Sequence, residues 1–153
     1  LLRATIPSTI DIQCNVDENC GHIMGDPTQI HQVIMNLCTN AYHAMQETGG
    51  TLEVALKEVD ISYAKSVERV GMKVGRHLEL TVGDTGHGME PQVLERIFEP
   101  YYTTKKQGKG TGLGLSICYG IIKKMGGDIS VDSTMDEGTT FAIKIPVREE
   151  HAA

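Results

Sequence analysis

The amino-acid sequence predicts an α/β (α+β) two-layer sandwich: a mixed, mostly antiparallel sheet of about five strands with three helices packed on one face. Two observations support this fold. Segments in which apolar and polar residues alternate, as in strands, are interspersed with segments that repeat apolar residues at helical spacing. Their order is strand, helix, strand, strand, short helix, polar segment, helix, strand, strand, without internal repeats or low-complexity segments.

The expected strands are short alternating runs bounded by turn residues. They span residues 10–16, 51–61, 77–84, 128–133 and 139–147. Asp136, Glu137 and Gly138 form the hairpin turn between the last two strands. Residues 62–75, between the second and third strands, are expected to form a polar loop.

The first long helix is expected over residues 26–46. Asp26 is a suitable N-cap and Pro27 suits the first helical position, while Gly49 and Gly50 follow the end. Its apolar positions recur at helical spacing: Ile30, Val33, Ile34, Leu37, Cys38, Ala41 and Met45. A short helix is expected over 91–98 and a second long helix over 113–125.

Composition excludes several classes of protein. The 153 residues suit a single domain, and 40% hydrophobic residues suffice for a core that is aliphatic, because Trp is absent. A net charge of -6 argues against nucleic-acid binding. No apolar run of about 18 residues and no signal peptide is visible, so we expect a soluble, cytoplasmic domain without direct membrane contact. Cys14, Cys20 and His22 match no zinc spacing.

A glycine-rich segment, 108–116 (GKGTGLGLS), leads into the second long helix. Glycines allow backbone N–H groups to approach a ligand closely, and a helix N-terminus favours a phosphate. Lys105 adds positive charge just upstream. The segment fits neither the Walker A pattern nor the dinucleotide fingerprint. For the glycines alone, a flexible surface loop is the favoured explanation, so the rest of the chain has to decide.

Polar side chains on the first long helix and after the third strand suggest a nucleotide site. Asn36, Asn40 and His43 lie within about 60° of one another beside the apolar stripe. Asp84 ends the third strand, where its carboxylate could accept a hydrogen bond from the adenine amine but would oppose the guanine carbonyl oxygen. The alternatives are solvated polar residues at the margin of the helix and an ordinary turn aspartate.

Together these segments resemble the catalytic, ATP-binding (HATPase) domain of sensor histidine kinases, in the GHKL ATPase and kinase superfamily. The resemblance rests on residues 36–41 (NLCTNA), 84–88 (DTGHG), 95–105 (ERIFEPYYTTK), 108–115 (GKGTGLGL) and 138–141 (GTTF). It implies the GHKL fold and one catalytic and ATP-binding domain over 1–153. In that domain, residues 26–46 would be the Asn-box helix, 84–89 the first glycine box, 99–112 the ATP lid and 113–125 the helix after the second glycine box.

The resemblance also implies residue roles. Asn40 would coordinate Mg²⁺, Asp84 would bind the adenine amine, and Thr139 would lie near the base. Gly86 and Gly88 would let the backbone pass beside the base. The phosphates would be held by Lys105 and by the backbone of Gly110, Thr111, Gly112, Leu113 and Gly114. The catalytic group would comprise Asn36, Asn40, His43 and Lys105.

The function implied is transfer of the γ-phosphoryl group of Mg-ATP to a histidine. That histidine would lie on a separate dimerisation and phosphoacceptor domain, which we expect to be absent from this chain, and a response-regulator receiver domain would act downstream. The excised domain should be monomeric, because the parent is expected to dimerise through helices missing from this chain. It should hydrolyse ATP slowly, because Asn36 stands where related ATPases carry a glutamate base. A nucleotide-binding regulatory module and an anti-sigma-type serine kinase remain alternatives.

Overall fold

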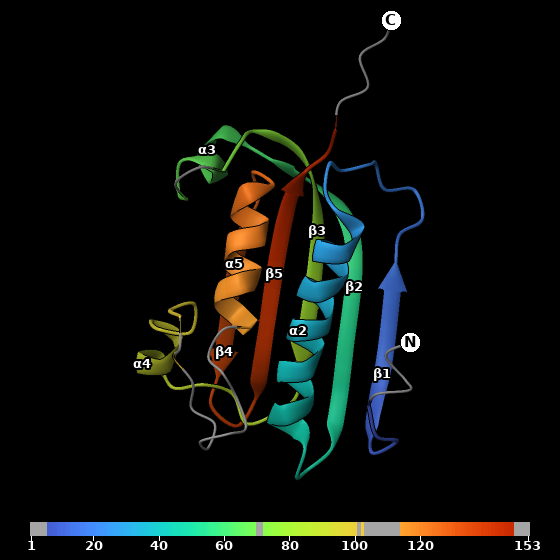
Figure 1. Cartoon of the computed structure of the whole chain (residues 1–153), viewed down its shortest axis with the longest axis vertical. Helices are drawn as coiled ribbons and strands as arrows, with labels where there is room; N and C mark the ends of the chain where they lie inside the picture. Colours follow the sequence, from blue (N-terminus) through green and yellow to red (C-terminus); the bar gives the residue numbers. More distant parts are fainter. Residues whose placement is uncertain (1–5, 70–71, 101, 103–113, 149–153) are drawn as a thin grey trace, which may run out of the picture.

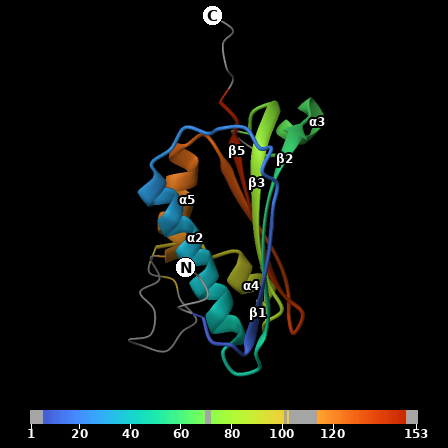
Figure 2. The ribbon, with the colours of Figure 1, turned by 90° about the vertical axis from the view of Figure 1, so that its right-hand side faces the viewer.

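The structure, a computed structural model, describes residues 6–69, 72–100, 102 and 114–148. A five-stranded sheet with the order β1-β2-β3-β5-β4 forms one layer, and helices α2 and α5 cover one of its faces (Figures 1 and 2). The strands are β1 (Ile10–Val16), β2 (Gly50–Ile61), β3 (Gly75–Asp84), β4 (Asp128–Thr134) and β5 (Gly138–Pro146). β1 and β2 are parallel and the other pairs are antiparallel. The predicted mixed sandwich is confirmed.

Helix α2 (Pro27–Met45) begins as its sequence predicts. Asp26 is the N-cap, and its side chain accepts a hydrogen bond from the Thr28 amide at 2.9 Å. This bond satisfies one of the amides that the first helical turn leaves without an intrahelical partner. The buried stripe of the helix consists of Val33, Leu37, Cys38, Ala41 and Met45.

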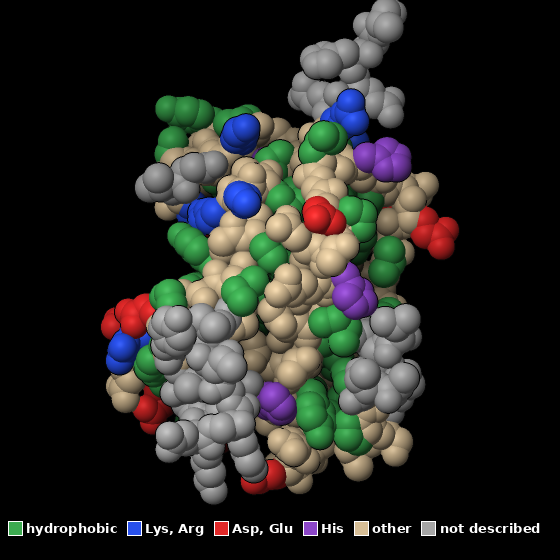
Figure 3. Space-filling view, viewed as in Figure 1, with side chains coloured by type: hydrophobic (Ala, Val, Ile, Leu, Met, Phe, Trp, Pro, Cys, Tyr) green, Lys and Arg blue, Asp and Glu red, His purple; other side chains and the backbone are tan. Residues whose placement is uncertain are grey.

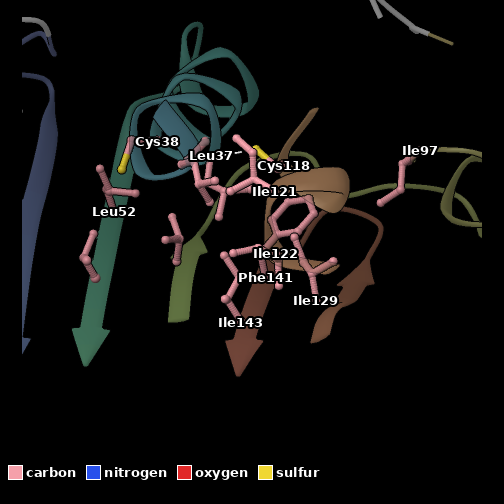
Figure 4. Packing of buried hydrophobic residues seen from close by; sticks show 14 of the residues in the cluster. Leu37, Cys38, Leu52, Ile97, Cys118, Ile121, Ile122, Ile129, Phe141 and Ile143 are labelled. Atoms are coloured by element: carbon pink, nitrogen blue, oxygen red, sulfur yellow. Dashed lines mark hydrogen bonds between the residues drawn. The ribbon is translucent and has the colours of Figure 1, made fainter. Parts of the chain in front are cut away.

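Helix α5 (Gly114–Lys124) packs beside α2 and completes the apolar layer. Cys118, Ile121 and Ile122 are buried, and they meet Phe141 and Ile143 of β5 over the sheet (Figure 4). The two helices also bury a thiol each. Burial raises the pKa of Cys38 to about 11 and also raises the pKa of Cys118.

Two short helices differ from the sequence predictions. Helix α4 (Pro91–Leu94) is shorter than the expected span 91–98, because the backbone bonds shift to three-residue turns after Leu94, as in Arg96 N–H to Val93 C=O at 3.0 Å. Helix α3 (Tyr63–Ser66) lies within the expected loop 62–75. The Ser62 hydroxyl accepts from the Lys65 amide at 3.3 Å and caps its start. In the sequence, the Ser62 cap was the available signal for this short helix.

Charged side chains form a ladder across the sheet. Lys57 of β2 and Lys144 of β5 both pair with Glu79 of β3, at 3.6 and 3.3 Å. Asp128 of β4, which is directly opposite Lys144, binds Arg69 and also Lys123 at 3.1 Å. The Arg69 contact ties the connection after α3 to the start of β4.

Among the described residues, no helix is both long enough and apolar enough to cross a membrane.

Candidate nucleotide site

A row of polar side chains closes one end of the apolar core. Asp84 of β3 is directly opposite Thr139 of β5, which is directly opposite Ser133 of β4. The next row on the same face is apolar and consists of Val82, Phe141 and Val131. The site therefore has an apolar wall behind it and three hydrogen-bonding groups at its edge.

Asp84 is held in this row by backbone donors. Its Oδ1 accepts from the Gly86 amide at 2.9 Å. Burial raises the pKa of its carboxyl, and the amides of Gly86 and Thr139 and the nearby His87 oppose that shift. One carboxylate, partly buried and fixed in direction, is thus available to an amine donor.

The turn after Asp84 packs directly on helix α2. The His87 amide donates to the Ala44 carbonyl oxygen at 3.3 Å. A Cβ added at Gly86 would lie 2.5 Å from that same oxygen, so only glycine permits this approach. Gly88 has φ +70°, and a Cβ there would lie 2.1 Å from the Thr134 carbonyl oxygen. The two glycines hold the turn between α2 and the β4–β5 hairpin.

Helix α2 also reaches the start of α5. Asn36 Nδ2 donates to the Gly114 carbonyl oxygen at 3.3 Å and contacts Cys118 Sγ at 3.7 Å. Asn40 and His43 follow on the same helix and are half-buried, and the His43 ring lies 5.4 Å from the Tyr42 ring. Figure 3 shows this helix face, with Lys or Arg side chains near the C-terminal end of α5. The last turn of α5 carries Lys123 and Lys124.

Described residues of the predicted site converge on one end of the sandwich. The turn 84–88 contacts α2 at Ala44, α2 contacts α5 at Gly114, and Thr139 pairs with Asp84. The described residues do not include most of the expected lid 99–112, nor the predicted phosphate-binding residues Lys105, Gly110, Thr111, Gly112 and Leu113.

Sequence reasoning missed Ser133, because only strand register reveals it beside Thr139. Within the described ranges, no group of three His, Cys, Asp or Glu side chains could hold a metal.

Asn36→Asp should lower the free energy of unfolding by about 1–3 kcal/mol, because it replaces a donor with an anionic oxygen facing the Gly114 carbonyl. Urea unfolding at neutral pH measures this change. Thr39→Asp is the matched control, since it places the same charge on an exposed position of the same helix. The control should change stability by less than about 0.5 kcal/mol. Equal losses in the two variants would show that the Asn36 bond contributes nothing specific.

The family described as "Histidine kinase-, DNA gyrase B-, and HSP90-like ATPase" matches residues 25–149. The chain belongs to this family. Its HATPase domain is 39% identical over 146 residues to sensor kinase CckA of Brucella abortus (strain 2308), covering 95% of this chain and 15% of CckA. It is 37% identical over 138 residues to the two-component sensor PprA of Pseudomonas aeruginosa, covering 90% of this chain and 14% of PprA.

Solved structures place the HATPase domain among histidine kinases. The mycobacterial sensor histidine kinase MprB matches with a TM-score of 0.75 and 26% identity, over 97% of this chain and 90% of that one. The catalytic domain of histidine kinase ThkA matches with a TM-score of 0.69 and 31% identity, over 91% and 80%. The chain is therefore a catalytic domain of the histidine kinase type. It spans 14–15% of the length of CckA and PprA.

Proposed function

We propose that this domain binds Mg-ATP and donates the γ-phosphoryl group to a histidine on a separate dimerisation and phosphoacceptor domain in two-component signalling. The observation that carries the proposal is the half-buried Asp84 carboxylate, fixed by the Gly86 amide and paired with Thr139 at the end of the core. The likeness to sensor kinases supports it. This phosphoryl transfer would take place in the cytoplasm, where Mg-ATP is supplied.

Asp84 would select the base. Its carboxylate offers only acceptors while it is ionised, so it matches the 6-amino group of adenine and opposes the 6-oxygen of guanine. Gly86 and Gly88 would let the backbone pass beside the base, and the lack of side chains at these positions also lets the turn pack closely on Ala44 and Thr134. The apolar row beginning with Val82 and Phe141 would pack against its ring.

The amide of Asn40 fits Mg²⁺ in ligand type but is insufficient alone. Mg²⁺ prefers oxygen ligands and is usually bound together with substrate phosphates. Asn40 would supply one oxygen, and the metal would neutralise phosphate charge. Lys105 and the segment Gly110–Gly114 would hold the phosphates, with His43 nearby on α2. We expect no tight Mg²⁺ binding without nucleotide, which calorimetric titration of the metal into the free protein would test.

Asn36 would keep bound ATP from rapid hydrolysis. A water molecule needs a general base, and a side-chain amide does not act as one. In this domain the Asn36 amide also donates to Gly114, at the start of α5. Phosphoryl transfer would then rest on positioning and on electrostatic stabilisation, with the nucleophile brought by the acceptor domain. The phosphohistidine would pass its phosphoryl group to a response-regulator receiver domain.

Binding titrations with ATP, ADP and GTP, with and without Mg²⁺, test the nucleotide site. Tight Mg-dependent ATP binding and weak GTP binding are expected. Mixing the domain with radiolabelled ATP and a histidine kinase dimerisation domain then tests transfer. Acid-labile label on that domain is the expected result. Label on serine would favour the anti-sigma-type kinase, and ATP binding without transfer would favour a regulatory module.

A further inference from the structure

The Ser133 hydroxyl joins three elements at the end of the core. It accepts a hydrogen bond from the Met89 amide at 2.8 Å, at the end of the turn that begins with Asp84. It donates to the Gly138 carbonyl oxygen at 3.1 Å. Its oxygen also lies 2.7 Å from Thr139 Oγ1, in a contact for which either hydroxyl could be the donor.

Counting protons decides the direction of that last bond. A serine hydroxyl has one proton and two lone pairs. The Gly138 carbonyl can only accept, so it takes the Ser133 proton, and the Met89 amide can only donate, so it fills one lone pair. The remaining lone pair accepts the Thr139 proton. Thr139 Oγ1, which belongs to a residue only 6% exposed, is left with lone pairs alone.

We propose that Ser133 is a positioning residue that determines base specificity by fixing Thr139 as a hydrogen-bond acceptor beside Asp84. The inference rests on the proposed function. Asp84 and Thr139 are directly opposite each other on adjacent strands, so their side chains lie close enough to meet the same edge of a base. That edge of the base would face only hydrogen-bond acceptors, the Asp84 carboxylate and Thr139 Oγ1. A 6-amino group can donate to both, whereas a 6-oxygen would face no donor.

Inosine triphosphate is the sharpest probe, because its base carries a 6-oxygen and lacks the 2-amino group of guanine. We would measure dissociation constants of Mg-ATP and Mg-ITP by competition with a fluorescent nucleotide. In Ser133→Ala the Thr139 hydroxyl can turn and donate to the 6-oxygen. The preference for ATP over ITP should then narrow by about five- to tenfold, mainly through tighter ITP binding.

Controls separate this role from a structural one. Ser130→Ala removes a hydroxyl from the same strand, where Ser130 donates to the Ala142 carbonyl at 3.5 Å on the opposite face, and should leave the preference unchanged. Adding Ser133→Ala to Thr139→Val should change the preference no further. Thr139→Ser keeps the hydroxyl and should retain the preference for ATP over ITP. Comparing the preference of this variant with that of Thr139→Val, which lacks the hydroxyl, tests the inference even if Ser133→Ala does not fold.

The outcomes are distinguishable. If Ser133→Ala weakens ATP and ITP equally, Ser133 only supports the hairpin and the inference is wrong. An unchanged preference in both Ser133→Ala and Thr139→Val would also overturn it, while leaving the proposed function intact. If the unmodified protein fails to bind Mg-ATP at all, the proposed function itself fails, and the inference fails with it.

Discussion

Asp84→Asn is expected to weaken ATP binding by about one to two decades. The substitution replaces a charged acceptor by an amide, and hydrogen bonds to charged groups contribute about 1.5–3 kcal/mol. The asparagine oxygen can still accept from the Gly86 amide, so the turn should keep its shape. Calorimetric titration of Mg-ATP measures the loss, and unchanged affinity would remove Asp84 from the base site.

The same variant should be more stable than the unmodified protein at neutral pH. Burial raises the pKa of Asp84 above its ordinary value of 3.8, so the folded state holds this proton more tightly than the unfolded chain. That contribution to stability is fully present below 3.8 and is lost as pH rises through the raised pKa. The ionised carboxylate therefore costs stability at neutral pH, and the neutral asparagine avoids that cost.

Urea unfolding of both proteins, from neutral pH down to 3.8, tests this link between the Asp84 pKa and stability. The stability advantage of Asp84→Asn should shrink as the pH falls and Asp84 takes up its proton. A difference in unfolding free energy that stays constant with pH would show that the burial of Asp84 is not the cause. ATP affinity of the unmodified protein should fall over the same pH range, because the protonated carboxyl loses its charge.

Gly88→Ala should destabilise the domain by roughly 2–4 kcal/mol and weaken ATP binding at least about tenfold. The residue has φ +70°, which disfavours any side chain, and the new Cβ would meet the Thr134 carbonyl oxygen, a backbone atom that cannot turn away. The turn would have to shift, and Asp84 would move with it. Thermal unfolding and nucleotide titration measure the two effects.

Gly120→Ala is the matched control for this substitution. Gly120 lies in helix α5, and a Cβ added there meets no atom within 4 Å. Alanine should stabilise that helix by about 0.5–1 kcal/mol and leave ATP binding unchanged. If Gly88→Ala behaved like Gly120→Ala, the turn after Asp84 would not depend on close backbone approach.

Local sequence signals predicted the regular elements well. The Asp26 cap and the apolar spacing predicted α2, and alternation predicted each strand to within a residue or two of its observed ends. The short helices were harder. One turn of helix gives too few positions for a period, so α3 had only the Ser62 cap as a signal, and α4 changed to three-residue turns without a sequence marker.

The candidate site could be proposed from the sequence only where local motifs or family likeness indicated it. Asp84 and the glycines of its turn are adjacent in sequence, so the motif was visible. Ser133, Thr139 and Asp84 become one row only through the register of β4, β5 and β3, which no local pattern records. For the same reason, nothing in the sequence indicated that Asn36 donates to Gly114.

The two buried thiols can report how often the helix layer opens. Cys38 and Cys118 lie at 1% and 0% exposure, with raised pKa values, so alkylating reagents reach a reactive thiolate there only when the helices separate from the sheet. Cys14 is exposed and should be labelled first. Slow labelling of Cys38 and Cys118 would then measure how often the helix layer opens. A nucleotide bound at the proposed site, between the helices and the turn after Asp84, should slow this labelling further.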